Sequence, residues 1–505
     1  MHMRKKIFTI LIAMIISTGC VKTPNESYVV KKSEGLSEEA VANAMGKGET
    51  KVSPAPKHWT DSIVKGNGKV TIESDIDINT TRLPNTPVLK LKKKDLDTNM
   101  LKKLTEYLLG DPKKLYHVKN TTHKELESIR AEIQNQEGDY GNPDRMYWNQ
   151  QLIQNIDDLL SEKDTNGKLE ALQKVDFNTL EQSLYSIVYE GKADKESSIT
   201  NKKIFFSAQT KTDTLAYIFA NKRDEEYGIA PKYEYTIGTY FTKKTVDDAK
   251  QNISRYKSMK DINIKWLDQY EVYVKQMEEA VGKSTLEKNK YENKAKKILS
   301  EMGIDNLNVI ESYPSTWIPE NLEWNKMKAK FSEAEGAYTV VFGKSVKGLP
   351  SYISQGGTTY DDLPEQVYKP PFDPEVLNIT FIDSQVVDFR WENMSKVENT
   401  IAENTNLLQF DEIKERFADH VLYAAIALDK VNDKDSQSLS HRYVIRSVDL
   451  EYSNINAFDE PQNAWIVPVW VFKMDWYLTV KGNQEILREP ETVVINALDG
   501  GYVGN

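Results

Sequence analysis

Histidine and cysteine are common zinc ligands, so their spacing is the first test for chemistry in this sequence. His117 and His123 are six positions apart, which does not place both side chains on one face of a helix. No His-Glu-x-x-His pair occurs, and the chain has one cysteine. The sequence therefore predicts no metal site, and each histidine is interpreted as a surface residue. The histidines are His2, His58, His117, His123, His420 and His441.

Two short segments partly match ligand-binding loops. Gly343-Lys344-Ser345 ends like a phosphate-binding loop, but Tyr338 stands where that motif needs its first glycine. We interpret this segment as a turn between strands. Glu162 to Gln173 begins like a calcium loop, but such a loop needs Asp at its first position and Glu at its last. A polar turn between helices is the preferred interpretation there, and calcium binding is the alternative.

Covalent catalysis by a serine has no local motif in this chain. Ser351, Ser354 and Ser438 all lack the Gly-x-Ser-x-Gly elbow. A catalytic triad is defined by its geometry rather than by sequence order, so a site assembled from distant residues stays open as an alternative. Acidic residues are too numerous for one pair to stand out as a glycosidase site. The sequence predicts no catalytic and no cofactor-binding residue.

Three tryptophans lie close together near the C-terminus. In an extended strand Trp470 and Trp476 share a face, and Trp465 points to the other. Core packing is the preferred interpretation, and an aromatic groove for a peptide or a sugar is the alternative. We expect Trp470 to be buried, because its apolar run is typical of a strand covered on both faces. Pro468 cannot donate a ladder hydrogen bond, so we expect that strand to lie at a sheet edge or to bulge there.

Cys20 follows a basic head, an apolar run and a group of small residues. Positions 4 to 6 are basic, Ile7 to Ile16 is apolar, and Ser17-Thr18-Gly19 precedes the cysteine. This order is typical of a secretory signal. The apolar run is shorter than a membrane span, which needs about 20 residues. A single cysteine cannot form a disulfide within the chain, so the fold must be held by its core.

This N-terminus resembles the signal of bacterial lipoproteins, in which the signal is cut just before a cysteine that is linked to diacylglycerol. The resemblance implies that residues 1–19 are the signal peptide and that Cys20 is the lipidated mature N-terminus. Ser17 stands where the family prefers Leu, Val or Ile, and Ile16 is one place earlier. Two acyl chains suffice for stable attachment to a membrane. A plain secreted protein is the alternative.

Length and charge limit the class of protein. The 505 residues allow roughly two to four domains. The formal charge is −10, and loss of the three basic residues with the signal makes it −13. An acidic chain argues against nucleic acid as a partner and against broad adhesion to anionic lipid. The acyl anchor would then be the contact with the membrane.

The patterns of apolar residues predict an α+β fold, with short antiparallel sheets packed against helices. Val21 to about His58 is polar and rich in glycine and proline, so we expect a flexible tether that is dispensable for folding, with a short helix at Ser37–Ala44. The other predicted helices are Asp95–Leu109, Thr122–Gln136, Trp148–Leu160, Asn178–Tyr189, Val246–Met259, Trp266–Glu279, Leu286–Met302, Ser395–Asn404 and Phe410–Ile426. The predicted strands are Lys69–Asn79, Val88–Leu91, Ile204–Ala208, Thr214–Asn221, Tyr233–Thr242, Ala337–Phe342, Ser351–Ser354, Val376–Ile382, Gln385–Glu392, Arg442–Tyr452, Trp465–Val480 and Thr492–Asn496.

The C-terminal part, from about Lys283 to Gly501, resembles PepSY-like modules, which consist of a helix and two strands. Three segments carry the resemblance. They are the strand Ala337–Phe342 after a helix that ends at a glycine, the run Ala464–Phe472 with its Pro-Val-Trp, and Val493–Gly501 with its Asn-Ala-Leu-Asp-Gly. Membrane-tethered regulators of cell-wall histidine kinases in Gram-positive bacteria end similarly. The body from about Lys69 also resembles Gram-positive lipoproteins of unknown function. These resemblances imply tethered interaction or regulation and bring no catalytic residues.

The sequence thus predicts a signal peptide at 1–19, a lipidated flexible tether at 20–58, and three modules at 59–201, 202–330 and 331–505. The preferred function is a binding or regulatory module on the outer face of the cytoplasmic membrane, with a protein or peptide partner. An extracytoplasmic hydrolase of peptide or glycan is the alternative. A solute-binding lipoprotein fits less well, because helices and strands here come in blocks rather than as alternating βα units.

Overall fold

A computed structural model gives the structure of the chain. It describes residues 32–45, 51–52, 55–78, 82–83, 85–109, 115–117, 123–135, 153–154, 156–157, 160, 184–188, 200–204, 206–210, 216–221, 232–237, 239–258, 267–283, 287–318, 334–353, 367–431, 439–458, 460–480, 485–488 and 490–504. Cys20, the signal at 1–19, His2, Ser354, Ser438 and the segment Glu162 to Gln173 lie outside these residues.

The chain divides into two units, each built from segments that are distant in the sequence. Unit 1 contains Met1–Leu91, Ser354–Phe372 and Val397–Asn505, and unit 2 contains Lys92–Ile353 and Asp373–Lys396. Both units combine helices with largely antiparallel sheets, which confirms the predicted α+β fold in more than one module. Strands β21 and β22, of 19 and 21 residues, are longer than the short strands predicted. The division into three successive modules stays a prediction.

Unit 1 is built on one sheet with the strand order β17-β25-β24-β22-β21-β3-β2. Neighbouring strands run antiparallel except at β17–β25 and at β21–β3. The elements assigned to it are η2 (Lys32–Glu34), α2 (Glu38–Ala44), β1 (Lys51–Val52), β2 (His58–Lys65), η3 (Gly66–Gly68), β3 (Val70–Asp77), β4 (Arg82–Leu83), β17 (Val367–Tyr368), α9 (Phe410–Val431), β21 (Leu439–Ala457), β22 (Glu460–Val480), β23 (Ile486–Leu487), β24 (Glu491–Asn496) and β25 (Tyr502–Val503). The boundary between the units falls within β5 (Val88–Lys93) and β20 (Ser395–Ala402), which pair with each other.

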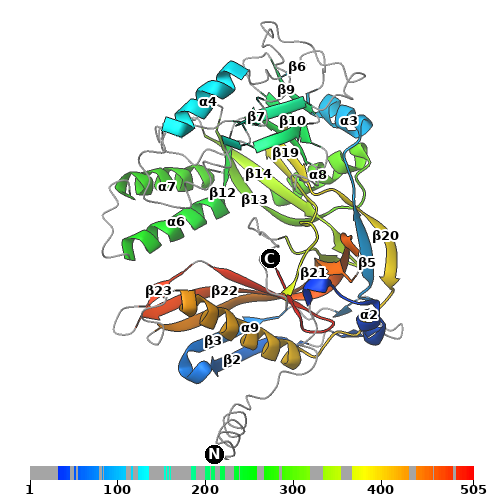
Figure 1. The fold of residues 1–505 in the computed structure, drawn as a ribbon, viewed down its shortest axis with the longest axis vertical. Helices are drawn as coiled ribbons and strands as arrows, with labels where there is room; N and C mark the ends of the chain where they lie inside the picture. The colour runs from blue at the N-terminus through cyan, green and yellow to red at the C-terminus, as the bar shows by residue number, and fades with distance from the viewer. Residues whose placement is uncertain are drawn as a thin grey trace, which may run out of the picture. The chain divides into compact units, whose positions relative to one another are not determined.

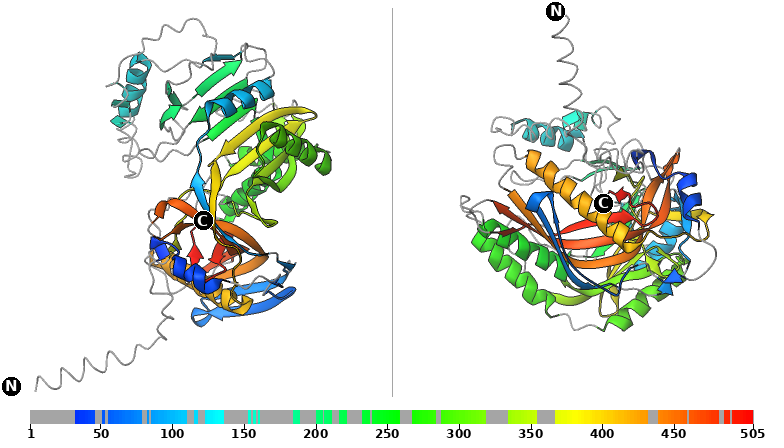
Figure 2. Two further views of the ribbon diagram at one scale, coloured as in Figure 1. Left: turned by 90° about the vertical axis from the view of Figure 1, so that its right-hand side faces the viewer. Right: turned by 90° about the horizontal axis from the view of Figure 1, so that it is seen from below.

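Helix α9 covers one face of the unit 1 sheet, as Figure 1 and the right-hand view of Figure 2 show. Phe417 of α9 stacks on Phe472 of β22, with 4.1 Å between ring centroids. Phe410, in the first turn of α9, meets the ring of Trp470 edge-on at 5.5 Å. Trp470 is buried, as the sequence predicts. Rings of this size dominate the apolar area that such a core removes from water.

Unit 2 is built on a second sheet with the order β12-β13-β14-β18-β19-β11-β10-β9-β6. Every neighbouring pair in this sheet is antiparallel. The elements of the unit are α3 (Thr98–Leu109), β6 (Leu115–His117), α4 (His123–Asn135), β7 (Leu184–Val188), β8 (Thr200–Ile204), β9 (Phe206–Thr210), β10 (Ala216–Asn221), β11 (Lys232–Ile237), β12 (Thr239–Thr242), α6 (Lys243–Ser258), α7 (Leu267–Val281), α8 (Lys288–Met302), β13 (Asn308–Ile318), β14 (Glu335–Gly343), β15 (Ser345–Val346), β16 (Leu349–Pro350), β18 (Val376–Ile382) and β19 (Gln385–Glu392).

Helix α8 packs on one face of the unit 2 sheet. Its buried residues include Tyr291 and Ile298, which share a core cluster with Tyr338 and Phe342 of β14. The helix ends at Gly303, whose φ of 75° is the left-handed conformation that glycine adopts without steric cost. The predicted end of this helix is therefore confirmed.

The same order of elements occurs in each unit. In unit 2, α8 is followed by β13, β14 and β18, which pair in that order. In unit 1, α9 is followed by β21, β22 and β24, which also pair in that order. In both, the helix packs on one face of the antiparallel strands that follow it. The resemblance to PepSY-like modules itself stays a prediction.

Two predicted helices are wrong. Ser395–Asn404 contains strand β20, whose Val397, Thr400 and Ile401 favour extended backbone over helix. Asn178–Tyr189 contains strand β7, whose sequence Leu-Tyr-Ser-Ile-Val is rich in strand formers. In both cases the segment pairs with another strand, β20 with β5 and β7 with β8.

The prediction of a flexible tether is wrong for residues 32–45. Leu36 and Val41 are buried in unit 1. The backbone N–H of Leu36 donates to the carbonyl of Asn456 at 2.9 Å, and the N–H of Phe458 donates to the carbonyl of Leu36 at 3.1 Å. Ser37 caps α2 as predicted, because its hydroxyl accepts a hydrogen bond from the N–H of Ala40 at 3.1 Å.

The expected edge or bulge at Pro468 is also wrong. Strand β22 lies between β21 and β24, and its register with β21 does not shift at Pro468. The carbonyl of Pro468 accepts from the N–H of Ala497 at 2.9 Å, on the side where β24 has ended at Asn496. The N–H that proline lacks would point to that same side, so its absence leaves no ladder partner unpaired.

Candidate functional site

A row of buried hydroxyl groups crosses the face of the unit 2 sheet that points away from α8. Ser315 of β13 bonds to Thr339 of β14 at 3.0 Å between hydroxyl oxygens. Thr339 bonds in turn to Thr380 of β18 at 2.9 Å. All three side chains are buried, so the hydroxyls satisfy one another across three strands.

Asp388 of β19 continues this row, because it lies opposite Thr380 on one side and opposite Thr236 of β11 on the other. It is 1% exposed. Neither oxygen of its carboxyl group meets a hydrogen-bond donor in good geometry within the described part of the chain. Burial raises the pKa of Asp388 to about 7, against the lowering effect of Arg390. Asp388 is therefore largely protonated at mildly acidic pH.

A row of oppositely charged side chains on β11 and β19 ends at Asp388. Lys232 lies 3.0 Å from the carboxylate of Glu392, directly across the two strands, and 2.8 Å from that of Glu234. Arg390 donates to Glu234 at 2.8 Å, and its Nη2 lies 3.9 Å from Asp388. This row of ion pairs and the hydroxyl row meet at Asp388. Chemically, the arrangement can hold a proton near neutral pH, which is the property of a general acid.

Carboxyl groups with raised pKa are not confined to that place. In unit 1, burial raises the pKa of Glu451 to about 7 and that of Glu491 to about 7. Glu451 lies opposite Val469 and Glu491 opposite Met474, so their side chains point to different faces of β22. Perturbed groups that belong to one active site would converge on a common point. These three carboxyl groups instead lie in two units and on different sheet faces.

The segment Gly343-Lys344-Ser345 joins β14 to β15 through Lys344 and is not the predicted turn, which lies instead at Lys347-Gly348 between β15 and β16. Lys344 lies 2.6 Å from the carboxylate of Glu375 and donates to the carbonyl of Ser395 at 3.0 Å. The indole N–H of Trp391 donates to the same carboxylate at 2.9 Å. Every bond of this buried lysine is to the protein itself, so its role is structural.

The histidines are less uniform than the sequence predicts. His441 is buried, and His420 is half-buried. Burial lowers the pKa of His420 to about 4, and its ring stacks on Tyr502 at 3.7 Å. His441 Nδ1 accepts a hydrogen bond from the indole N–H of Trp476 at 3.1 Å. His441, Tyr443 and Ile445 are buried at every second position of β21. This period of two in the sequence could have predicted the burial of His441.

The aromatic groove finds no support at two of its three tryptophans, because Trp465 and Trp470 are buried. Among the described residues, no group of three or more acidic, histidine or cysteine side chains is placed to hold a metal ion. Within the same residues, no helix is long and apolar enough to cross a membrane.

The second candidate is the outer edge of unit 1. Strand β2 pairs with β3 along its whole length and with no other strand that the structure describes. Trp59, Asp61 and Lys65 of β2 point to the α9 side: Trp59 meets Phe410 at 5.5 Å, Asp61 pairs with Lys414 at 3.1 Å, and Lys65 pairs with Asp419 at 2.7 Å. An edge strand leaves backbone donors and acceptors free for another extended chain.

On the opposite face of the same hairpin, His58 lies between two carboxylates of β3. Its Nδ1 is 2.7 Å from Asp77 and its Nε2 is 3.0 Å from Asp75. Hydrogen bonds to Asp77 and then to Asp75 raise the pKa of His58. Both ring nitrogens donate only when the imidazole is protonated, so this geometry favours the charged form. The spacing of metal ligands along the sequence gave no sign of this group, because Asp75 and Asp77 meet His58 only through the β2–β3 hairpin.

Comparison with known proteins adds little about function. No protein-family model matches the chain, and no curated protein matches it. A solved structure, that of an uncharacterized protein from Eubacterium rectale ATCC 33656, is similar over 89% of this chain and 94% of its own. The two sequences are 11% identical and the TM-score is 0.40, a likeness that carries no argument about activity.

Proposed function

We propose that the protein is a lipid-anchored binding module that holds a protein partner at the outer face of the cytoplasmic membrane. The observation that carries this proposal is the open edge of β2, where eight residues pair on one side alone among the described strands. Strand addition to such an edge is a common way of binding an extended segment of another protein.

The N-terminal segment supports the membrane part of the proposal. Residues 32–45 are packed into unit 1, so residues 21–31 alone would link a lipid on Cys20 to this packed segment. Eleven residues span at most roughly 40 Å when fully extended. The anchor would therefore keep unit 1 close to the bilayer, where a membrane-bound partner is within reach.

Two variants test the proposal in a Gram-positive host. Cys20→Ser is expected to move the protein from the membrane fraction to the soluble fraction. A photo-crosslinking residue in place of Val64 on β2 is expected to give an adduct with another protein in intact cells, whereas one in place of Val272 on α7 gives none. Val64 and Val272 are 59% and 58% exposed, so they form a matched pair. Retention of Cys20→Ser in the membrane, or adducts of equal yield at both positions, would contradict the proposal.

The hydrolase considered from the sequence has one observation in its favour, the carboxyl group of Asp388 with its pKa of about 7. A general acid needs a pKa near the working pH. Cleavage of casein or of purified cell-wall glycan by the parent protein, and its loss in Asp388→Asn, would favour this second function.

A further inference from the structure

The edge of β2 lacks two of the features that usually protect an exposed strand, a proline and a bulge. Natural edge strands are blunted by proline, by a bulge, or by a lysine that points inward. Strand β2 contains no proline, and its register with β3 runs without a shift from His58–Asp77 to Lys65–Val70. Its one lysine, Lys65, is held by Asp419 of α9. The backbone is therefore regular over the full strand, as pairing with a further strand requires.

One face beside this edge is acidic. Asp75 and Asp77 lie directly across from Thr60 and His58, and their side chains are 80% and 91% exposed. His58 is the basic group that contacts both of them, so the three groups together keep a net negative charge. A side chain on a strand added outside β2 would stand within reach of these carboxylates if it were as long as lysine or arginine.

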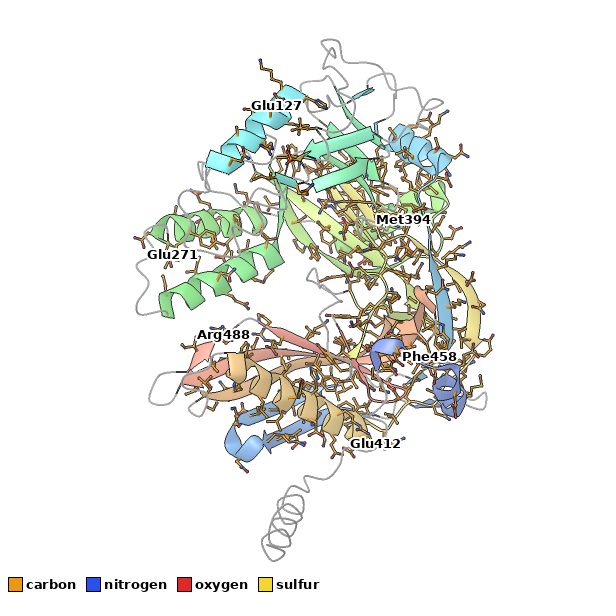
Figure 3. All side chains as sticks on the ribbon, viewed as in Figure 1. Glu127, Glu271, Met394, Glu412, Phe458 and Arg488 are labelled. Carbon is orange, nitrogen blue, oxygen red and sulfur yellow. The ribbon has the colours of Figure 1, made fainter. Side chains whose placement is uncertain are left out.

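The other face beside the edge is acidic as well. Asp411 of α9 is 90% exposed, and Asp419 is 50% exposed. Glu412, labelled in Figure 3, adds a further exposed carboxylate in the first turn of α9. Two lysines pair with carboxylates on this face, Lys414 with Asp61 and Asp411, and Lys65 with Asp419. With Glu412 this makes four carboxylates against two lysines, so the face keeps a net negative charge. A partner strand would therefore meet carboxylates on both of its faces.

An apolar contact is available at one end of the edge. Val64 is 59% exposed and lies near the end of β2, on the same face as Thr60 and Ser62. An apolar residue of the partner opposite Val64 would remove both side chains from water.

We propose that β2 binds an extended, lysine- or arginine-rich segment of another protein by strand addition. This inference rests on the proposed function and names the chemistry of its partner. Backbone hydrogen bonds to the outer edge of β2, where the N–H of Ser62 already donates to the carboxylate of Asp61 at 2.9 Å, would supply affinity for any extended chain. The carboxylates on both faces select a basic segment, since an acidic one would place like charges side by side.

A pair of short peptides tests the inference on the full chain in detergent. One alternates lysine with valine, and the other has glutamate in place of lysine. We expect the lysine peptide to bind with an affinity roughly tenfold or more above that of the glutamate peptide. We also expect its affinity to fall as the salt concentration is raised. It should also slow hydrogen exchange of backbone amides along β2, which locates the contact.

Ser62→Lys supplies the matched variant, because it adds a positive charge on the exposed face of the edge. It is expected to weaken binding of the lysine peptide by roughly tenfold while leaving the unfolding midpoint unchanged. Val272→Lys adds the same charge on α7 and is expected to leave binding unchanged.

Several results would overturn the inference. They are equal binding of the two peptides, no slowing of exchange in β2, and equal loss of binding in Ser62→Lys and Val272→Lys. Slowed exchange in β2 as protein concentration rises, with no peptide present, would assign the edge to a second copy of this chain instead. An adduct at Val64 in cells with no peptide binding would leave the proposed function standing and remove the basic partner. Peptide binding with no adduct at Val64 in cells would support the preference for a basic segment and contradict the proposed function.

Discussion

The ammonium group of Lys32 donates a hydrogen bond to the carboxylate of Asp499, although 467 positions separate them in the sequence. The hydroxyl of Tyr368 donates to the same carboxylate at 2.7 Å, and Lys32 lies 3.3 Å from that hydroxyl. The amide of Asn456 donates to the carbonyl of Ser33 at 2.6 Å. These bonds make the segment that starts at Lys32 a structural part of unit 1.

Removal of this segment should therefore destabilise the protein. A chain beginning at His58 loses Leu36 and Val41, and each buried apolar side chain contributes about 1.5–3 kcal/mol. A chain beginning at Lys32 keeps both and serves as the control. Urea unfolding should give a clearly lower midpoint for the shorter chain alone. Equal midpoints for the two chains would show that residues 32–57 are dispensable for folding, as the sequence predicts.

Gly35 should be the most sensitive position in the segment. Its φ is +108°, and a Cβ there would lie 2.6 Å from the backbone nitrogen of Phe458 and closer still to the carbonyl carbon of Ala457. Gly35→Ala should lower the free energy of unfolding by about 2–5 kcal/mol, from strain and overpacking together. Gly68→Ala is the control, because its φ is +87° with open space around it, and strain alone costs about 1–2 kcal/mol. Equal effects would show that Gly35 does not touch the backbone of Ala457.

Asp388 should make stability depend on pH. Its pKa rises from 3.8 to about 7 on folding, so between these values the folded protein binds a proton that the unfolded chain releases. The free energy of unfolding then falls as pH rises through this window, by at most about 4 kcal/mol. Asp388→Asn should remove that fall and be more stable than the parent at pH above about 7.

Urea unfolding at several pH values measures this effect. Asp305→Asn, at an exposed position, is the control and should keep the pH dependence of the parent. A parent whose stability does not fall between mildly acidic and mildly alkaline pH would contradict the raised pKa of the buried Asp388.

Local pattern predicted much of the fold. The stop of α8 at Gly303, the bounds of strands β18 and β19, and the burial of Trp470 all depend on neighbouring residues, and the structure confirms them. Pairing between distant segments could not be predicted from neighbouring residues. His441 lies beside Val70 in a parallel pair, and Leu36 beside Ala457, yet nothing local to either segment names its partner.

The candidate site shows the same limit. Asp388 alternates with Val387 and Phe389, so its strand reads as having one polar face turned to water. In the folded chain Asp388 is buried while Arg390 and Glu392 on the same face stay partly exposed, and the raised pKa of Asp388 follows from burial rather than from any motif. The edge of β2 was likewise hidden, because the tether was predicted to end at His58 and no strand was predicted before Lys69.

Trp470 provides the sharpest test of whether the aromatic residues near the C-terminus are core or binding platform. Its ring is fully buried against Phe410, in the strand between β21 and β24. Trp470→Ala should cost about 3–5 kcal/mol of unfolding free energy, as for other large aromatics in a core. Trp470→Phe keeps a ring against Phe410 and should cost clearly less. Urea unfolding of both variants measures the difference. An unchanged midpoint for Trp470→Ala would mean that the ring is not part of the core. It would then favour the alternative interpretation, an aromatic groove for a peptide or a sugar.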